Sequence, residues 1–271
     1  MRVTQAGVFA SRTVHAAGVG CFLVAGAFML PAVLLRGWPL TLLLVSSCAA
    51  GYAYTGGPFP LGYHGMGDVT VIVFFGFVAT GGMRYVQGGG DVFMSWPTAL
   101  ASLQVGLLCA VLLAINNLRD VTTDALVGKS TLPVIFGLRF GRWEVTALLG
   151  LPYALNACWL ATVSSAADDG GKTEGGLGQG GNDRGAGGAW GIPVRWGCVH
   201  AAALTSLTLP MAVRIARRVW AYVPPTPRFN ALLAEAAALH LLFGSLLAAG
   251  IVLDDAPLYA LHCTGGIQAN E

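Results

Sequence analysis

Long apolar runs separated by short polar stretches dominate the chain. A membrane-spanning helix needs roughly 17 to 25 mostly apolar residues. Seven segments of about that length run near residues 17–35, 37–55, 66–83, 97–115, 145–163, 197–213 and 231–253. The fourth, "PTALASLQVGLLCAVLLAI", is apolar on every side, whereas a strand of a membrane barrel would alternate over about ten residues. The pattern therefore predicts an all-α, polytopic transmembrane helical bundle.

Composition supports this class and excludes others. The 271 residues are 55% hydrophobic and 10% charged, with a positive mean hydropathy of +0.66, which is too apolar for a soluble α/β domain. The net charge is +2, and no basic patch is interleaved with aromatic residues, so a nucleic-acid partner is not expected. We interpret residues 1–271 as one integral membrane domain, interrupted by a flexible Gly-rich loop at 164–191.

The positive charges predict how the chain is oriented. If the seven segments alternate in direction, ten of the 15 Lys and Arg residues fall on one side and five on the other. By the positive-inside bias, the richer side faces the cytoplasm or its organellar equivalent. That side holds two polar stretches, 54–68 and 116–144, which are therefore expected to lie together.

The first candidate site is "INNLRDVTTDALVGKST", residues 115–131, directly after the fourth apolar segment. If the helix continues through residue 124, then Asn116, Asp120 and Asp124 lie four residues apart on one face. Ionisable groups at membrane depth mark an ion or substrate site by default. Carboxylates with neighbouring amides suit Mg²⁺, which typically bridges protein carboxylates and substrate phosphates.

Four cations follow within or near the same loop: Arg119, Lys129, Arg139 and Arg142. Guanidinium and ammonium groups beside such a metal suit a diphosphate. The alternative is that all these groups are solvated loop charges at a membrane boundary. A nucleotide-binding P-loop is rejected, because "VGKST" has Thr123 where that motif requires glycine.

A second polar cluster lies between the second and third apolar segments, at 52–68. Tyr54, Tyr63 and Asp68 supply aromatic and hydrogen-bonding groups within a loop rich in glycine and proline. The alternative reading is an interfacial aromatic belt in which Asp68 caps a helix. Its predicted position beside the Asp motif favours a joint site.

These stretches resemble the UbiA superfamily of intramembrane prenyltransferases. "NNLRDVTTDALVGKSTLPVIFG" is similar to that family's second Asp-rich motif, and "YAYTGGPFPLGYHGMGDVTVIVFFG" resembles a loop and helix of its 1,4-dihydroxy-2-naphthoate branch, the MenA type. The pair Asn116 and Asn117, the pair Arg119 and Asp120, and the "GKSTL" tail point to that branch. The likeness runs from about Arg2 to Leu253, apart from the Gly-rich insert.

The resemblance implies a nine-span bundle in which two Asp-rich motifs face each other. It implies that Asp120 and Asp124 bind Mg²⁺ and the diphosphate of a polyprenyl donor, a role to which Asn116 and Asn117 contribute. Lys129, with Arg119 and Arg139, would neutralise the leaving diphosphate. Tyr54, Tyr63 and Asp68 would lie near a dihydroxynaphthoate acceptor, whose carboxylate is lost as CO₂ on prenylation. The membrane would be the plasma membrane of a prokaryote or a plastid membrane.

One part of the family's pattern is missing. Its first Asp-rich motif, of the type Asn-Asp-x-x-x-Asp, does not occur in the chain, and "RVTQAGVFASRTVHAAG" resembles the segment that follows that motif. The resemblance therefore implies an N-terminal fragment of two further helices, supplied by a longer chain or by a partner. A non-catalytic copy and a membrane carrier with a cation site remain the alternative functions.

Overall fold

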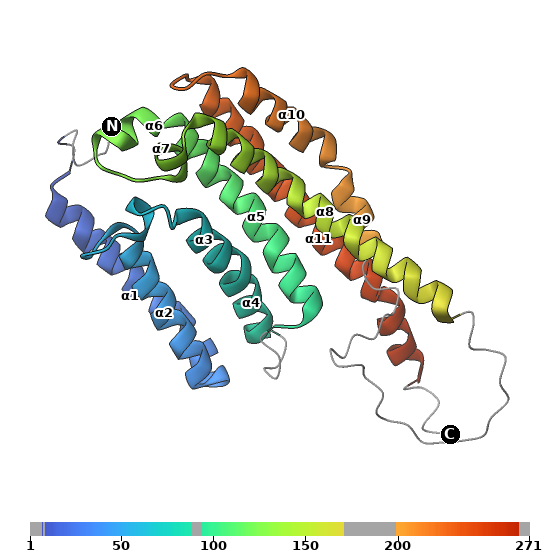
Figure 1. Ribbon diagram of the computed structural model, residues 1–271. Helices are drawn as coiled ribbons and strands as arrows, with labels where there is room; N and C mark the ends of the chain where they lie inside the picture. Colours follow the sequence, from blue (N-terminus) through green and yellow to red (C-terminus); the bar gives the residue numbers. More distant parts are fainter. Residues whose placement is uncertain (1–6, 8, 88–93, 171–198, 266–271) are drawn as a thin grey trace.

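A computed structural model describes residues 7, 9–87, 94–170 and 199–265, in which helices are joined by short loops (Figure 1). The elements are α1 (Ser11–Arg36), α2 (Trp38–Thr55), η1 (Leu61–Tyr63), α3 (Gly67–Val71), η2 (Ile72–Val78), α4 (Ala79–Gln87), α5 (Trp96–Arg119), α6 (Val121–Leu126), α7 (Leu132–Phe136), α8 (Leu138–Gly170), α9 (Val199–Ser206), α10 (Leu209–Ala221) and α11 (Arg228–Gly265). The described ranges contain no strand. The predicted all-α class is confirmed.

Fewer helices qualify as spans than the sequence predicts. Within the described residues, four are long and apolar enough to cross a membrane: Ser11–Arg36, Gly67–Gln87, Trp96–Arg119 and Arg228–Asp254. Helices α9 and α10, bent by 45° at their junction, make a fifth if they form one broken span. The count of seven is therefore not confirmed. Helix α2 contains two serines and two tyrosines, which lower its mean hydropathy.

The predicted loop at 164–191 begins later than expected. Helix α8 continues to Gly170, so the first seven residues of that stretch are helical. The remainder, 171–191, lies outside the described residues.

Helix α5 is the centre of the bundle. It packs against η2, α8 and α11, and its residues Ala110, Ala114, Ile115 and Leu118 are fully inaccessible to solvent. The apolar run that predicted this helix is thus apolar on all sides because it is surrounded by other helices.

Helices α1 and α2 lie at the edge of the bundle (Figure 1). No residue of α1 is buried, and its large apolar side chains are exposed, for example Phe28 at 82% and Leu35 at 83%. In a bilayer such surfaces contact lipid tails, which are as apolar as leucine. The edge position and apolar surface of this hairpin fit an integral membrane protein.

Two glycines bring α5 and η2 into close contact. A Cβ atom on Gly106 would lie 2.9 Å from the carbonyl oxygen of Ile72 and 3.1 Å from Cα of Gly76. A Cβ atom on Gly76 would lie 2.5 Å from the carbonyl oxygen of Ser102. Small residues permit such approach between membrane helices, where packing drives association. The contact places the π-helical segment η2, and α3 before it, directly against the helix that ends in the Asp motif.

A buried polar chain joins α5, α8 and α9. Gln104 Nε2 donates to Asn156 Oδ1 at 2.6 Å, and Asn156 Nδ2 donates to Thr205 Oγ1 at 2.8 Å. Nearby, the hydroxyl groups of Tyr153 and Thr208 are hydrogen bonded at 2.7 Å. Thr205 and Thr208 flank the bend between α9 and α10. The network therefore satisfies polar groups that would otherwise be costly in an apolar interior.

Replacing Gln104 with leucine tests this network. We expect Gln104→Leu to destabilise the protein by about 1 kcal/mol, because Asn156 loses its hydrogen-bond donor inside the bundle. The melting temperature in detergent measures the effect. The matched control is Gln87→Leu, at an exposed position at the end of α4, which should leave the melting temperature unchanged. Equal effects of the two variants would contradict a stabilising role for the network.

Candidate active site

The Asp motif lies at a break in the helix. Helix α5 ends at Arg119, Asp120 has φ −96° and ψ 9°, and α6 begins at Val121. Hydrogen bonds of the helical type continue across the break, from Asp120 N to Asn116 O at 3.0 Å and from Asp124 N to Asp120 O at 2.8 Å. The spacing of four residues is therefore kept, although the helix is not continuous through residue 124.

Arg119 organises the first cluster. Its Nε and Nη2 atoms donate to the two carboxylate oxygens of Asp120, both at 2.7 Å. Nη2 also donates to Asn116 Oδ1 at 2.6 Å, and Nη1 donates to Asn230 Oδ1 at 2.9 Å. Asn230 belongs to α11, so this arginine ties the end of α5 to the start of the last helix. The forked geometry makes the pair with Asp120 strongly directional.

This cluster borders a cavity. Arg119, Asp120 and Asn230 line a space of about 430 Å³ together with the segment Pro225–Pro227. The lining is rich in hydroxyl, amide and charged groups, so the cavity suits a polar or ionic ligand.

Lys129 organises the second cluster. Its Nζ atom donates to Asp124 Oδ2 at 3.0 Å and to Asn117 Oδ1 at 3.5 Å. Asp124 is 8% exposed and Asn117 is 3% exposed. The backbone turns back at this point, where Lys129 N donates to Asp124 O at 2.9 Å. Each carboxylate of the motif therefore has its own cation, Asp120 with Arg119 and Asp124 with Lys129.

The loop at 54–68 contacts the Asp motif, as the sequence predicts. Ser130 N donates to Tyr63 O at 2.8 Å. A Cβ atom on Gly65 would lie 3.3 Å from Ser130 O, and Gly65 has φ +72°, a conformation that L side chains rarely adopt. The two polar stretches thus form one end of the bundle.

Asp68 lies where these elements meet. It is 7% exposed, and its charge interacts with Lys129 and with the hydroxyl group of Tyr54. That hydroxyl oxygen lies 3.2 Å from the position of a Cβ atom on Gly67. From α8, Glu144 reaches the carboxyl group of Asp68. Glu144 and Asn230 were not predicted as site residues, because each comes from a helix that only the packing of the bundle brings to the Asp motif.

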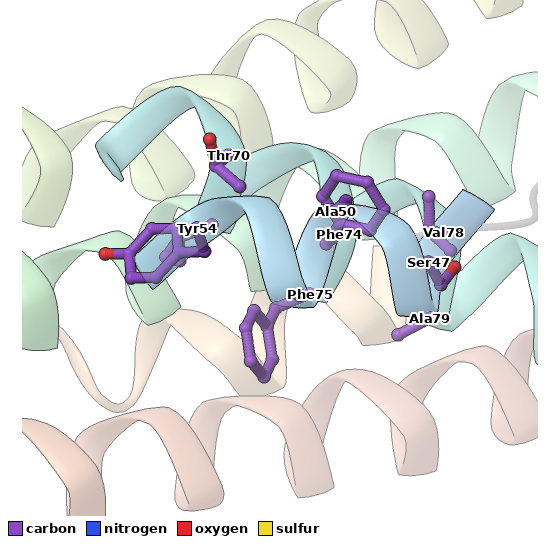
Figure 2. Close-up of a pocket in the computed structure, with 10 residues that line it drawn as sticks. Ser47, Ala50, Tyr54, Thr70, Phe74, Phe75, Val78 and Ala79 are labelled. Carbon is purple, nitrogen blue, oxygen red and sulfur yellow. The ribbon is translucent and has the colours of Figure 1, made fainter. Parts of the chain in front are cut away.

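An apolar cavity of about 530 Å³ adjoins this end, between α2 and the segment from α3 to α4. Figure 2 shows Tyr54 at one end of it, and Ser47, Val78 and Ala79 at the other. Phe74 and Phe75 contribute aromatic walls (Figure 2). The cavity therefore runs from the polar cluster into an apolar region.

Arg139 and Arg142 are not part of this cluster. Arg139 is exposed at the start of α8. Arg142 donates from Nη2 to Tyr222 O at 3.0 Å, and its guanidinium group lies 5.9 Å from the ring centre of Trp220. Its contacts therefore connect α8 with α10.

The carboxylate and amide oxygens of the Asp motif suit a divalent cation that also binds a ligand. Among the residues that the structure describes, no group of three or more His, Cys, Asp or Glu side chains could hold a metal ion by itself. Mg²⁺ is commonly bound through one or two carboxylates and completed by phosphate oxygens and water. Asp120 and Asp124, with the amide oxygens of Asn116 and Asn117 nearby, fit that arrangement.

Comparison with known proteins defines the class. The sequence matches the UbiA prenyltransferase family over residues 1–167. This covers more than half of the chain, so the protein belongs to the UbiA prenyltransferase family and is an integral membrane helical bundle.

Several individual relatives carry one name. The chain is 40% identical over 117 residues to the 1,4-dihydroxy-2-naphthoate octaprenyltransferase of Haemophilus influenzae, and 38% identical over 112 residues to that of Mycobacterium leprae. These segments are 43% and 41% of this chain, but 36% and 37% of the relatives. The 2-carboxy-1,4-naphthoquinone phytyltransferase of Synechocystis is 28% identical over 144 residues, covering 50% of this chain and 46% of the relative.

Proposed function

We propose that the protein takes part in Mg²⁺-dependent transfer of a polyprenyl group from polyprenyl diphosphate to 1,4-dihydroxy-2-naphthoate, with loss of the ring carboxylate as CO₂. This step belongs to menaquinone or phylloquinone synthesis. The observation that carries the proposal is the pairing of Asp120 with Arg119 and of Asp124 with Lys129 at the end of the bundle to which Tyr54 and its apolar cavity also belong. The names of the relatives support the same substrates.

The charged end would bind the diphosphate. Asp120 and Asp124 would hold Mg²⁺, which neutralises charge that develops on the leaving group. Arg119 presents a planar fork of donors and Lys129 a compact charge, two complementary ways to bind phosphate oxygens. Lys129 is already held between Asp124 and Asn117, so it needs little reordering to stabilise the departing diphosphate.

The apolar cavity would receive the uncharged part of a substrate. Tyr54 closes its polar end and lies beside Asp68, so these two residues would orient the hydroxyl groups of an aromatic acceptor. Tyr63 is linked through its carbonyl group to Ser130, next to Lys129. Donor and acceptor would thereby meet at the boundary between the polar cluster and the apolar cavity, where water is largely excluded.

The paired cations also weigh against a carrier for cations. A bare carboxylate site would favour a metal ion alone, whereas carboxylates that alternate with Arg and Lys favour an anion bound together with a metal. We place the enzyme in the plasma membrane of a prokaryote or in a plastid membrane, where such quinones are made. Arg139 remains a predicted contributor to diphosphate binding.

An assay in detergent or liposomes tests the proposal. The purified protein, given dihydroxynaphthoate and polyprenyl diphosphate with Mg²⁺, should form the prenylated, decarboxylated product. Chelation of the metal should lower the rate at least about tenfold, and added Mg²⁺ should restore it. Calorimetry should show inorganic diphosphate binding only when Mg²⁺ is present. Metal-independent transfer, or ion flux through liposomes without any transfer, would refute the proposal.

A further inference from the structure

Two acidic side chains from distant parts of the chain meet at this end of the bundle. The carboxyl groups of Asp68 in α3 and Glu144 in α8 lie within hydrogen-bonding reach of each other. Asp68 is 7% exposed, and both carboxyl oxygens of Glu144 are inaccessible to solvent. The pair is separate from Asp120 and Asp124, which have their own cations.

In the part of the chain that the structure describes, three of the four carboxyl oxygens of this pair lack a hydrogen-bond donor. These are Asp68 Oδ1 and both carboxyl oxygens of Glu144. Ionised carboxylates only accept hydrogen bonds, whereas a protonated carboxyl group also donates one. Two adjacent carboxylates that lack donors do not both ionise readily, because burial and mutual repulsion oppose the second charge. One proton on the pair supplies the missing donor.

Among the residues that the structure describes, one cation acts on the pair. Lys129 interacts with the charge of Asp68, while its hydrogen bonds go to Asp124 and Asn117. The hydroxyl group of Tyr54, in α2, is a weak acid that lies near the negative charge of Asp68. It therefore supplies no positive charge to the pair. A single lysine thus balances Asp124 and the pair together.

The neighbouring helices carry other cations, among them Arg142 on α8 and Arg214 and Arg217 on α10, but of the described residues Lys129 is the one whose charge acts on the pair. Helix α7, which packs against α8, holds no titratable residue. Of the charged groups on α9 to α11, Arg218 is paired with Glu235 and His200 with Asp254. Lys129 is therefore the cation on which the charge of the carboxyl pair acts.

We propose that Asp68 and Glu144 share one proton, and that Glu144 is a positioning residue that keeps the pair at a single negative charge beside Lys129. The consequence rests on the proposed function. With one negative charge, the pair leaves Lys129 available to Asp124 and to an anionic ligand. Loss of the shared proton places a second negative charge there, which draws Lys129 toward the pair and repels a diphosphate.

The pKa of Glu144 supports this arrangement. Burial raises the pKa of this residue from 4.5 to about 8, and the adjacent charge of Asp68 raises it in the same direction. The neutral form is thus favoured in the folded protein between these two values. The stability that the neutral Glu144 side chain contributes to the folded protein is complete below pH 4.5, and it is lost as the pH rises through about 8.

Glu144→Gln, a neutral residue of the same size, tests the inference. In the wild type, about one tenth of the pairs keep the shared proton at about pH 9, so kcat/KM for the donor should fall about tenfold between about pH 7 and pH 9. In Glu144→Gln this alkaline fall should disappear. The matched control is Glu235→Gln, which removes a carboxylate paired with Arg218 and should keep the wild-type pH profile. An unchanged alkaline fall in Glu144→Gln would overturn the inference.

Infrared spectroscopy gives a second readout that does not need activity. The wild-type protein at about pH 7 should show a protonated carboxyl band that disappears on raising the pH through about 8. The band should be absent in Glu144→Gln and should titrate at lower pH in Asp68→Asn, which removes the neighbouring charge. If the band behaves as expected but no prenyl transfer occurs, the pair stands and the proposed function fails. If transfer occurs without such a band, the inference fails and the proposed function stands.

Discussion

Asp124→Asn is expected to lower the rate of prenyl transfer by about 100-fold or more. Asparagine has nearly the same size and can still accept a hydrogen bond from Lys129, so the fold around this buried position should be kept. The substitution removes the negative charge that would hold Mg²⁺ and that fixes the position of the Lys129 ammonium group. Losing one prearranged electrostatic contact of this kind typically costs about 100- to 1,000-fold in rate.

Rates at saturating donor and at saturating Mg²⁺ measure the effect. The control is Glu235→Gln, which likewise removes the carboxylate of an ion pair, here with Arg218, but lies outside the cluster and should retain wild-type activity. Melting temperatures of both variants separate misfolding from loss of chemistry. A well-folded Asp124→Asn protein with a wild-type rate would show that Asp124 is not part of the active site.

Gly106→Leu is expected to prevent α5 and η2 from packing together. The backbone of the neighbouring helix lies 2.9 Å from the position of the first added carbon, and backbone atoms cannot move aside as the end of a side chain can. Overpacking of this kind costs about 1–3 kcal/mol and occasionally more. Because α5 is the central helix, the yield of monodisperse protein in detergent should fall sharply, and the remaining protein should melt at a lower temperature.

Gly150→Leu in α8 is the matched control, since no atom lies within 4 Å of a Cβ atom built at Gly150. Leucine also favours helix over glycine, by up to about 1 kcal/mol, so this variant should be as stable as the wild type or more so. If Gly106→Leu were equally stable, the close approach of the two helices would not be required for the fold.

The lengths of the apolar segments predicted where the helices lie, because a helix needs apolar side chains both against lipid and in the core of the bundle. The segment 97–115 became the central helix α5, and 231–253 lies within α11. The bend between α9 and α10 was not predicted: Pro210 in the first turn of α10 favours a helix break there, and Thr205 and Thr208 beside it are hydrogen bonded to α8. Hydropathy averaged along a segment does not register contacts of that kind.

The candidate site was predictable where its residues are close in sequence. Helical periodicity predicted that Asn116, Asp120 and Asp124 follow one another at successive turns, and backbone hydrogen bonds of the helical type join Asn116 to Asp120 and Asp120 to Asp124. The contact of the 54–68 loop with the Asp motif was predicted from the distribution of Lys and Arg residues and from the alternation of the apolar segments between the two sides of the membrane. The role of Glu144 could not be predicted from the sequence, because its partner Asp68 is brought near only by the packing of α3, α5 and α8. An acidic residue one position before a long apolar segment was the only local signal for it.

Because each carboxylate is paired separately with a cation, the proposed site would bind some ligands more tightly than others. Arg119 and Lys129 balance Asp120 and Asp124, so these two ion pairs carry no net charge before any substrate arrives. A ligand that binds must then replace the carboxylates as partners of the two cations, and the cations as partners of the two carboxylates. Free diphosphate would compete for the cations but leave two bare carboxylates, and free Mg²⁺ would do the reverse. A magnesium diphosphate complex replaces both partners at once, so the site should select the complex over either component alone.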